Sequence, residues 1–251
     1  MTLRVRAKRT RERSDLARLG PCAVGVALGR RRTRRTARAK RRAGSGALDA
    51  FLTAIERGLR SLAGGTVAAR PNPASDIESS LTDDERRHAA GLMRVNHCGE
   101  VCAQALYEGQ SLTARAADVQ QALETAAEEE RDHLAWCRER LAELDSRPSI
   151  LEPFFYVASY ATGAAAGFLG DKVSLGFVEA TEDQVGQHLE DHLGRLPVGD
   201  GKSRAILEAV RADELRHGDQ ARLAGATVFP AAVKTAMRLA SRLMTGATYR
   251  L

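Results

Sequence analysis

The sequence predicts an all-α protein built around a four-helix bundle, and three observations support this prediction. Glu and His residues recur in two matched sets, each spaced over one helix, a turn and a return helix. Prolines and glycines divide the chain into segments of helical length. Near the two ends of the predicted domain, residues 48–63 and 228–244 carry apolar side chains at helical spacing.

The matched sets consist of a lone Glu followed by a Glu-x-x-His motif. The lone Glu precedes its motif by 30 residues in the first set and by 32 in the second. Positions i and i+3 lie on one helix face, so each motif aims a carboxylate and an imidazole at the same point. Two such helices, with one Glu from each of two others, form the di-iron or di-manganese site of ferritin-like bundles. The predicted metal ligands are Glu100, Glu130 and His133 in the first set, and Glu182, Glu214 and His217 in the second.

A third Glu-x-x-His match, Glu85 to His88, is excluded as a ligand pair. It lies in the opening turn of a predicted helix, where acidic residues favour the helix dipole, and it has no partner set. The alternative for the two accepted sets is that they are solvated Glu and His residues on helix faces.

The charge of the chain divides it into two parts. Residues 1–42 hold 16 Lys and Arg against two acids, whereas the rest holds 22 Lys and Arg against 30 acids. We therefore predict a basic, disordered extension at 1–47, which we attribute to a start codon assigned too far upstream, and one domain at 48–251. Few aromatic residues and no base-stacking or zinc-finger pattern occur, so no nucleic acid partner is expected for this domain.

The cysteines form no Cys-x-x-Cys motif, which argues against a disulfide scaffold and fits a reducing compartment. Cys98 and Cys102 flank Glu100 on one predicted helix. Buried core thiols are favoured over metal ligands at these positions.

The predicted elements follow the chain in order. An amphipathic helix precedes a linker; two helices of the first ligand set follow; an apolar stretch leads into a third bundle helix; and a fourth precedes a basic amphipathic helix. Gly91 and Gly99 favour a bend or break near 96–99. The ranges are 48–63 for the first amphipathic helix, 64–80 for the linker, and about 82–116 and 117–144 for the two helices of the first ligand set. The apolar stretch covers 153–178 and continues as the third bundle helix to 193. The fourth bundle helix covers about 203–224, and the basic amphipathic helix covers 228–244.

Two of these segments leave a choice between a structural and a functional interpretation. The apolar stretch 153–178 is either a buried bundle helix or a wall that touches lipid. The segment 228–244 either lies in an anionic membrane interface or closes the bundle. We thus predict apolar and amphipathic membrane-facing helices beside the bundle, and an additional N-terminal helix.

Three further residues are candidates for an outer role at the site. Tyr107, seven residues after Glu100, either lines a pocket beside a metal or is a core tyrosine. His188 is off the face of Glu182 on a regular helix and is an outer candidate at best. Asp213 precedes Glu214, and its carboxylate can accept the outer N–H of a metal-bound His on a neighbouring helix.

The chain resembles the demethoxyubiquinone hydroxylase family, di-iron monooxygenases of ubiquinone biosynthesis. The resemblance covers about residues 48–251 and is carried by residues 94–100, 104–110, 130–137, 176–185 and 213–217. It implies a ferritin-like fold, two Fe²⁺ ions on the six predicted ligands, and hydroxylation of a polyprenyl demethoxyubiquinol (2-polyprenyl-3-methyl-6-methoxy-1,4-benzoquinol) with O2. Cys98 and Cys102 stand where small residues are expected in this family.

The resemblance also implies partners and a location. An insoluble polyprenyl substrate suggests peripheral association with a membrane: the cytoplasmic face of the bacterial inner membrane, or the matrix side of the mitochondrial inner membrane. Other ubiquinone-biosynthesis proteins are expected partners, and a homo-oligomer is left open. Electrons come from a reductase, from the quinol, or from NADH bound without a Rossmann unit, because no Gly-x-Gly-x-x-Gly fingerprint occurs.

Three other functions remain as alternatives. A ferritin-like ferroxidase or iron-binding protein and a manganese catalase-like enzyme share the ligand set. A metal-free, membrane-associated helical scaffold shares only the helices.

Overall fold

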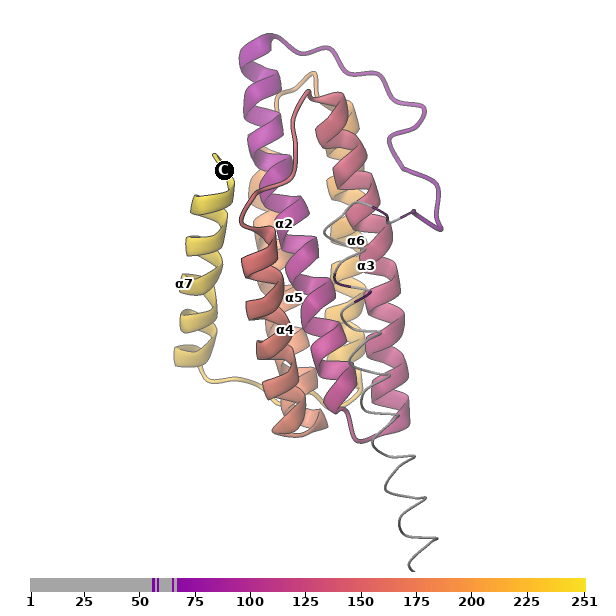
Figure 1. The fold of residues 1–251 in the computed structure, drawn as a ribbon, viewed down its shortest axis with the longest axis vertical. Coiled ribbons are helices and arrows are strands. Elements are labelled where there is room, and N and C mark those ends of the chain that lie inside the picture. Colours follow the sequence, from indigo (N-terminus) through magenta and orange to yellow (C-terminus); the bar gives the residue numbers. More distant parts are fainter. Residues whose placement is uncertain (1–55, 57, 59–64, 66) are drawn as a thin grey trace, which may run out of the picture. The chain divides into compact units, whose positions relative to one another are not determined.

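The computed structural model describes residues 67–251 together with Glu56, Gly58 and Gly65. The predicted extension 1–47 and nearly all of the predicted helix 48–63 lie outside the described residues. Within the described part the regular elements are helices, and no strand occurs. They are α2 (Asp83–Thr113), α3 (Ala117–Glu143), α4 (Glu152–Phe168), α5 (Asp171–Arg195), α6 (Gly201–Leu223) and α7 (Ala231–Thr248) (Figure 1).

The four helices that carry the predicted ligands form the bundle, in which α2 packs on α3 and α5 packs on α6. A small apolar cluster of Val101, Ala105, Leu134 and Tyr156 lies toward α4, and two larger clusters form the rest of the described apolar core. One contains Leu92, Trp136 and Ile206, and the other contains Tyr107 and Leu123. On each bundle helix the predicted ligands fall between residues of these two clusters, so the ligands form a polar layer with apolar packing on both sides. The predicted ferritin-like helical bundle is confirmed.

Helix α2 runs without the predicted break. Thr82 and Glu85 form a capping box at its start, which satisfies backbone N–H groups of the first turn. A side chain at Gly91 would collide with the ring of Tyr249, while one at Gly99 would meet nothing within 4 Å. Gly91 therefore serves close packing, and the helix continues through both glycines.

The apolar stretch 153–178 is divided between two helices, which its composition did not predict. Gly170 separates α4 from α5 and has a φ of +115°, a conformation that favours glycine. Helix α4 packs against α2 through glycines: an added Cβ at Gly163 would lie 2.2 Å from the Leu106 carbonyl oxygen, and one at Gly109 would lie 2.2 Å from that of Tyr160.

The opposite face of α4 is exposed and apolar. It carries Phe154, Val157 and Phe168, with alanines between them, and the only charged side chain of the helix, Glu152, is buried. Neither a buried bundle helix nor a wall open to lipid describes this stretch completely, because one face of α4 is buried and the other is open. Among the described residues, no helix combines the length and the apolar character needed to cross a membrane.

Helix α7 is fastened mainly at its two ends. Before its start, the Thr227 N–H donates to the Lys172 carbonyl (2.9 Å). Beyond its last turn, the Tyr249 hydroxyl and His88 Nδ1 lie 2.8 Å apart, and Arg94 donates to the Tyr249 carbonyl (2.7 Å). Within the helix only Thr248 is buried. The bundle is therefore already closed without most of α7.

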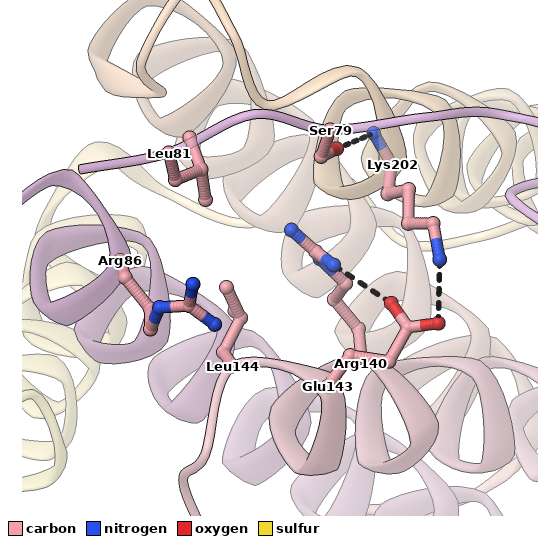
Figure 2. A pocket seen from close by; sticks show the side chains of 7 residues that line it. All are labelled: Ser79, Leu81, Arg86, Arg140, Glu143, Leu144 and Lys202. Carbon is pink, nitrogen blue, oxygen red and sulfur yellow. Dashed lines mark hydrogen bonds and ion pairs between the residues drawn. The ribbon is translucent and has the colours of Figure 1, made fainter. Parts of the chain in front are cut away.

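Residues 67–81, here called the entry segment, were predicted as part of a linker, but they are bound to the bundle. Near the C-terminal end of this segment, the Lys202 N–H donates to Ser79 Oγ (3.0 Å). Beside this contact, Glu143 accepts from Arg140 and from Lys202 (2.7 Å each). Ser79, Arg140, Glu143 and Lys202 line a hollow with a volume of about 320 Å³, and Figure 2 shows their side chains. None of the six predicted ligands lines it. The hollow is thus separate from the site described next.

Candidate metal centre

The structure brings all six predicted ligands together in the polar layer of the bundle. Each is at most 4% exposed. Their ligand atoms form two groups, within each of which all atoms lie within 4.8 Å of one another. One group holds Glu100, Glu130, His133 and Glu214, and the other holds Glu182, Glu214 and His217.

Glu130 and Glu214 each contact both imidazoles: one oxygen of the carboxylate lies near His133, and the other lies near His217. Glu130 Oε2 lies 3.1 Å from Nδ1 of His133, and Oε1 lies 3.7 Å from Nδ1 of His217. Glu214 Oε1 lies 3.3 Å from Nδ1 of His133, and its Oε2 lies 3.4 Å from Nδ1 of His217. The two Glu-x-x-His glutamates thus lie between the two halves of the centre.

Glu100 and Glu182 each belong to one half. Glu100 Oε2 lies 3.5 Å from Nδ1 of His133. Glu182 accepts a short hydrogen bond from the Tyr107 hydroxyl, and the Tyr107 ring meets the His217 ring edge-on at 6.1 Å between centroids. Tyr107 is therefore both a buried tyrosine and a direct neighbour of the centre.

The outward nitrogen of each imidazole meets a carboxylate from the neighbouring helix. His133 Nε2 lies 3.0 Å from Asp213 Oδ2, the contact anticipated for Asp213, and His217 Nε2 lies 2.5 Å from Glu129 Oε2. With Nε2–H donating outward, the Nδ1 lone pair of each neutral ring faces the centre, as a metal ligand requires. Glu129 was not among the predicted residues. Its signal was that an acid precedes the ligand glutamate in both motifs.

Two arginines lie outside these carboxylates. Arg216 donates to Asp213 Oδ1 (2.5 Å) and to Glu129 Oε2 (3.0 Å). Arg70, from the entry segment, donates to Asp213 Oδ2 (2.7 Å) and to Asp132 Oδ2 (2.6 Å). No local sequence pattern predicts Arg70, because its partners are 62 and 143 residues away.

Burial and crowded charge shift the pKa values of the centre in opposite directions. Burial, with the nearby charge of Glu214, raises the pKa of Glu130 and of Glu182 well above the ordinary range. Burial also acts to raise the pKa of Glu214, but the adjacent imidazoles of His133 and His217 outweigh it and lower that pKa. Burial acts to lower the pKa of His217, but the carboxylates around it, of which Glu214 has the largest effect, raise that pKa to about 9.

The donor set fits metal ions. Several inward-facing buried atoms have no hydrogen-bond partner in the described structure: Glu130 Oε1, Glu182 Oε2, both oxygens of Glu214, and His217 Nδ1. Buried acceptors without donors are unfavourable unless protons or cations neutralise them. Four carboxylates and two imidazoles are ligands that iron and manganese accept. The arrangement can therefore hold two divalent ions with Glu130 and Glu214 between them.

His188 does not join this cluster. Its ring lies against the tilted ring of His192, with centroids 3.9 Å apart, and His192 in turn contacts Asn96. No described contact links His188 to any of the six residues, so the structure gives no support to an outer role for it. Cys98 and Cys137 are buried thiols in the packing around the centre, and Cys102 is partly buried.

A solvent-facing cavity of about 360 Å³ adjoins only one half of the centre. Glu129, Arg216 and His217 line it together with polar residues of α3 and α6. The His217 half is therefore closer to solvent than the His133 half.

Comparisons with known proteins agree with this geometry. Residues 87–248 match the model of the family described as ubiquinone biosynthesis protein COQ7. Proteins named 3-demethoxyubiquinol 3-hydroxylase are similar to the chain: 58% identical over 207 residues in Cupriavidus pinatubonensis and 54% over 216 residues in Ralstonia pickettii, covering 81% of this chain and all of each relative. The Pseudomonas aeruginosa protein of that name is 54% identical over 206 residues, covering 81% of this chain and 96% of its own.

Proposed function

We propose, because this chain belongs to the family of ubiquinone biosynthesis protein COQ7, that its buried Glu and His centre holds two iron ions and uses O2 to hydroxylate its substrate. The chain is a hydroxylase of ubiquinone biosynthesis that acts on 3-demethoxyubiquinol. The iron ligands in this proposal are the six predicted residues. The reaction replaces a ring C–H by C–OH, and the second oxygen atom of O2 leaves as water after two electrons and two protons are supplied.

The observation that supports this proposal most is the paired geometry of the Glu-x-x-His glutamates. Glu130 and Glu214 each offer one oxygen toward each half, so both carboxylates would be available to an ion held in either half. Glu100 and His133 would hold one ion, Glu182 and His217 would hold the other, and the carboxylates of Glu130 and Glu214 would be available to both. Bound iron would supply the activation of O2, which no side chain can perform.

The protein's own residues position this chemistry and exclude water. Asp213 and Glu129 fix the orientation of the imidazoles, and the Tyr107 hydroxyl holds Glu182. Apolar packing on both sides of the polar layer limits the access of bulk water to the centre.

The substrate's polyprenyl chain requires a lipid environment, and we propose that the exposed faces of α4 and α7 provide contact with a membrane surface. The open face of α4 is mainly apolar, and the hydroxyl of its exposed Thr162 donates to the Ala158 carbonyl. Helix α7 exposes Leu239 and Leu243 together with Arg238 and Arg242, which suit an anionic interface, while Lys234 pairs with Glu179. The start of α4 and the end of α7 are joined, because the Ile150 N–H donates to the Leu251 carbonyl (3.1 Å).

The proposal is tested in cells that lack this hydroxylation step, by mass spectrometry of their extracted quinones. The unmodified chain should restore ubiquinone, whereas Glu130→Gln should leave demethoxyubiquinone and Glu128→Gln should behave as the unmodified chain. Glu128 is the matched control because its side chain is mostly exposed and pairs with Arg131 outside the centre.

Purified protein separates the parts of the proposal. Two iron ions per chain are expected in the unmodified protein and fewer in Glu130→Gln, with both proteins folded by circular dichroism. Restored ubiquinone without bound iron would refute the metal assignment. Two bound irons without ubiquinone would refute the assigned reaction.

A further inference from the structure

Charged side chains of alternating sign run across the outer faces of α3 and α6, behind the two imidazoles. The order is Asp132, Arg70, Asp213, Arg216, Glu129, and the successive contacts are 2.6, 2.7, 2.5 and 3.0 Å. His133 contacts the middle acid of this row, and His217 contacts the last one. The row therefore connects the outer supports of both halves.

Arg70 is the only member of this row that does not belong to a bundle helix. Its guanidinium lies 4.9 Å from the centre of the Trp136 ring, and its Nη2 lies 3.4 Å from Nε2 of His133. The neighbouring Ala69 N–H also donates to Asp132 (2.6 Å). The planar group is thus held on its face by Trp136 and at its edge by two carboxylates, an arrangement that a lysine cannot reproduce.

The two halves of the centre are supported unequally. Asp213, behind His133, accepts from two arginines that belong to different segments. Glu129, behind His217, contacts Arg216 of α6 and borders the solvent-facing cavity. The two halves of the centre have similar ligands, but the residues that support their imidazoles differ. The largest difference is that Arg70 contacts Asp213 behind His133 and not Glu129 behind His217.

We propose that Arg70 is a positioning residue that holds Asp213 against His133 and thereby strengthens metal binding in the His133 half alone. The inference rests on the proposed metal centre. An aspartate held by two cations keeps its position and charge, which fixes the imidazole with Nδ1 inward. Loss of an outer partner of a metal-bound His typically weakens metal binding 10- to 100-fold. Arg70 lies before residue 87, where the match to the family model begins.

The test measures how fast a chelator removes iron from the purified, iron-loaded full chain. Arg70→Ala should release about one of two irons roughly 10- to 100-fold faster, with the other unchanged. Arg70→Lys should fall between Arg70→Ala and the unmodified chain. Asp213→Asn should affect the same iron, and combining it with Arg70→Ala should add little, because both changes remove one support.

A purely structural role for Arg70 predicts a different outcome. Asn72→Ala removes another contact of the entry segment, the hydrogen bond from Asn72 Nδ2 to Glu139 (2.8 Å), without touching the guanidinium. If Asn72→Ala accelerated iron release as much as Arg70→Ala, Arg70 would only anchor the segment, and the inference would be wrong.

The Mössbauer spectrum of ⁵⁷Fe-loaded protein provides the second readout. Arg70→Ala should alter one iron environment and leave the other as it is in the unmodified chain. Equal changes in both environments, or unchanged spectra and release rates, would overturn the inference while leaving the proposed function intact. Absence of bound iron from the unmodified chain would instead overturn the proposed function.

Discussion

At the scale of single residues, Glu128 and Glu129 are neighbours with different surroundings. Glu129 contacts His217 Nε2, while Glu128 is mostly exposed and pairs with Arg131 one turn along the helix. We expect Glu129→Gln to lower metal affinity about 10- to 100-fold, because the amide is a weaker acceptor for the imidazole N–H. Glu128→Gln should leave affinity within twofold. Metal-binding isotherms of the two variants test this, and equal affinities would contradict it.

The shifted pKa values at the centre predict how the metal-free protein responds to pH. The folded-state pKa of His217 is about 9, above the ordinary 6.5, so its stabilising interactions are complete below pH 6.5 and are lost as the pH rises through 9. The raised pKa values of Glu130 and Glu182 act in the same direction, because deprotonation at higher pH leaves buried charge. The lowered pKa values of Asp213 and Glu214 contribute a constant amount throughout this range.

Urea unfolding in the presence of a chelator should therefore give a lower free energy of unfolding at pH 9 than at pH 6.5. For each group, a tenfold difference in proton affinity between the folded and unfolded chain corresponds to about 1.4 kcal/mol. With saturating Mn²⁺ the trend should reverse, since the metal replaces protons at the ligands. Rising stability of the metal-free protein between these pH values would refute the prediction.

Sequence reasoning found the residues whose relationship is local or repeated. Glu130 and His133 share a helix face, and the repeat of the motif made both sets recognisable. Asp213 followed from its place beside Glu214, and the same logic applied to Glu129 would have found it too. Arg70 could not be predicted, because its position depends on how the entry segment folds back over α3 and α6.

At the scale of elements, the contact between α2 and α4 depends on missing side chains. We expect Gly163→Ala to cost about 1–3 kcal/mol in the free energy of unfolding, because its Cβ would overlap the Leu106 carbonyl and force α4 outward. Gly194→Ala is the matched control, since nothing lies within 4 Å of that Cβ. It should gain about 0.5–1 kcal/mol from helix propensity. Thermal unfolding of both variants tests the pair, and equal effects would contradict it.

The bounds of α3 and α6 were predicted within about two residues and those of α2 and α7 within about four, whereas the division between α4 and α5 was missed. The apolar stretch 153–178 hid the boundary at Gly170, because composition does not distinguish one helix from two in sequence. Of the bend or break expected near 96–99, the break is absent, because α2 continues as one helix through Gly91 and Gly99. At Gly91 the space belongs to Tyr249, more than 150 residues along the chain.

At the scale of the whole molecule, the open apolar face of α4 predicts membrane binding. Phe154→Glu should weaken binding to anionic vesicles about tenfold or more, because a buried aromatic side chain contributes about 1.5–3 kcal/mol. Leu223→Glu, at an exposed leucine on α6, should leave binding unchanged. Vesicle sedimentation measures both. Equal binding of Phe154→Glu and the unmodified chain would exclude this face as the contact surface.

The attachment of α7 by its ends has a consequence for hydrogen exchange. Its central turns have few buried contacts that must be broken before the backbone opens, so their amide hydrogens should exchange sooner than those of α2. The residues nearest Tyr249 should exchange later than residues 232–243, because the contacts to His88 and Arg94 hold that end. On vesicles the difference should shrink. Slower exchange of individual α7 residues on vesicles would thus identify the residues at which lipid contacts protect a helix that the bundle itself packs only at its ends.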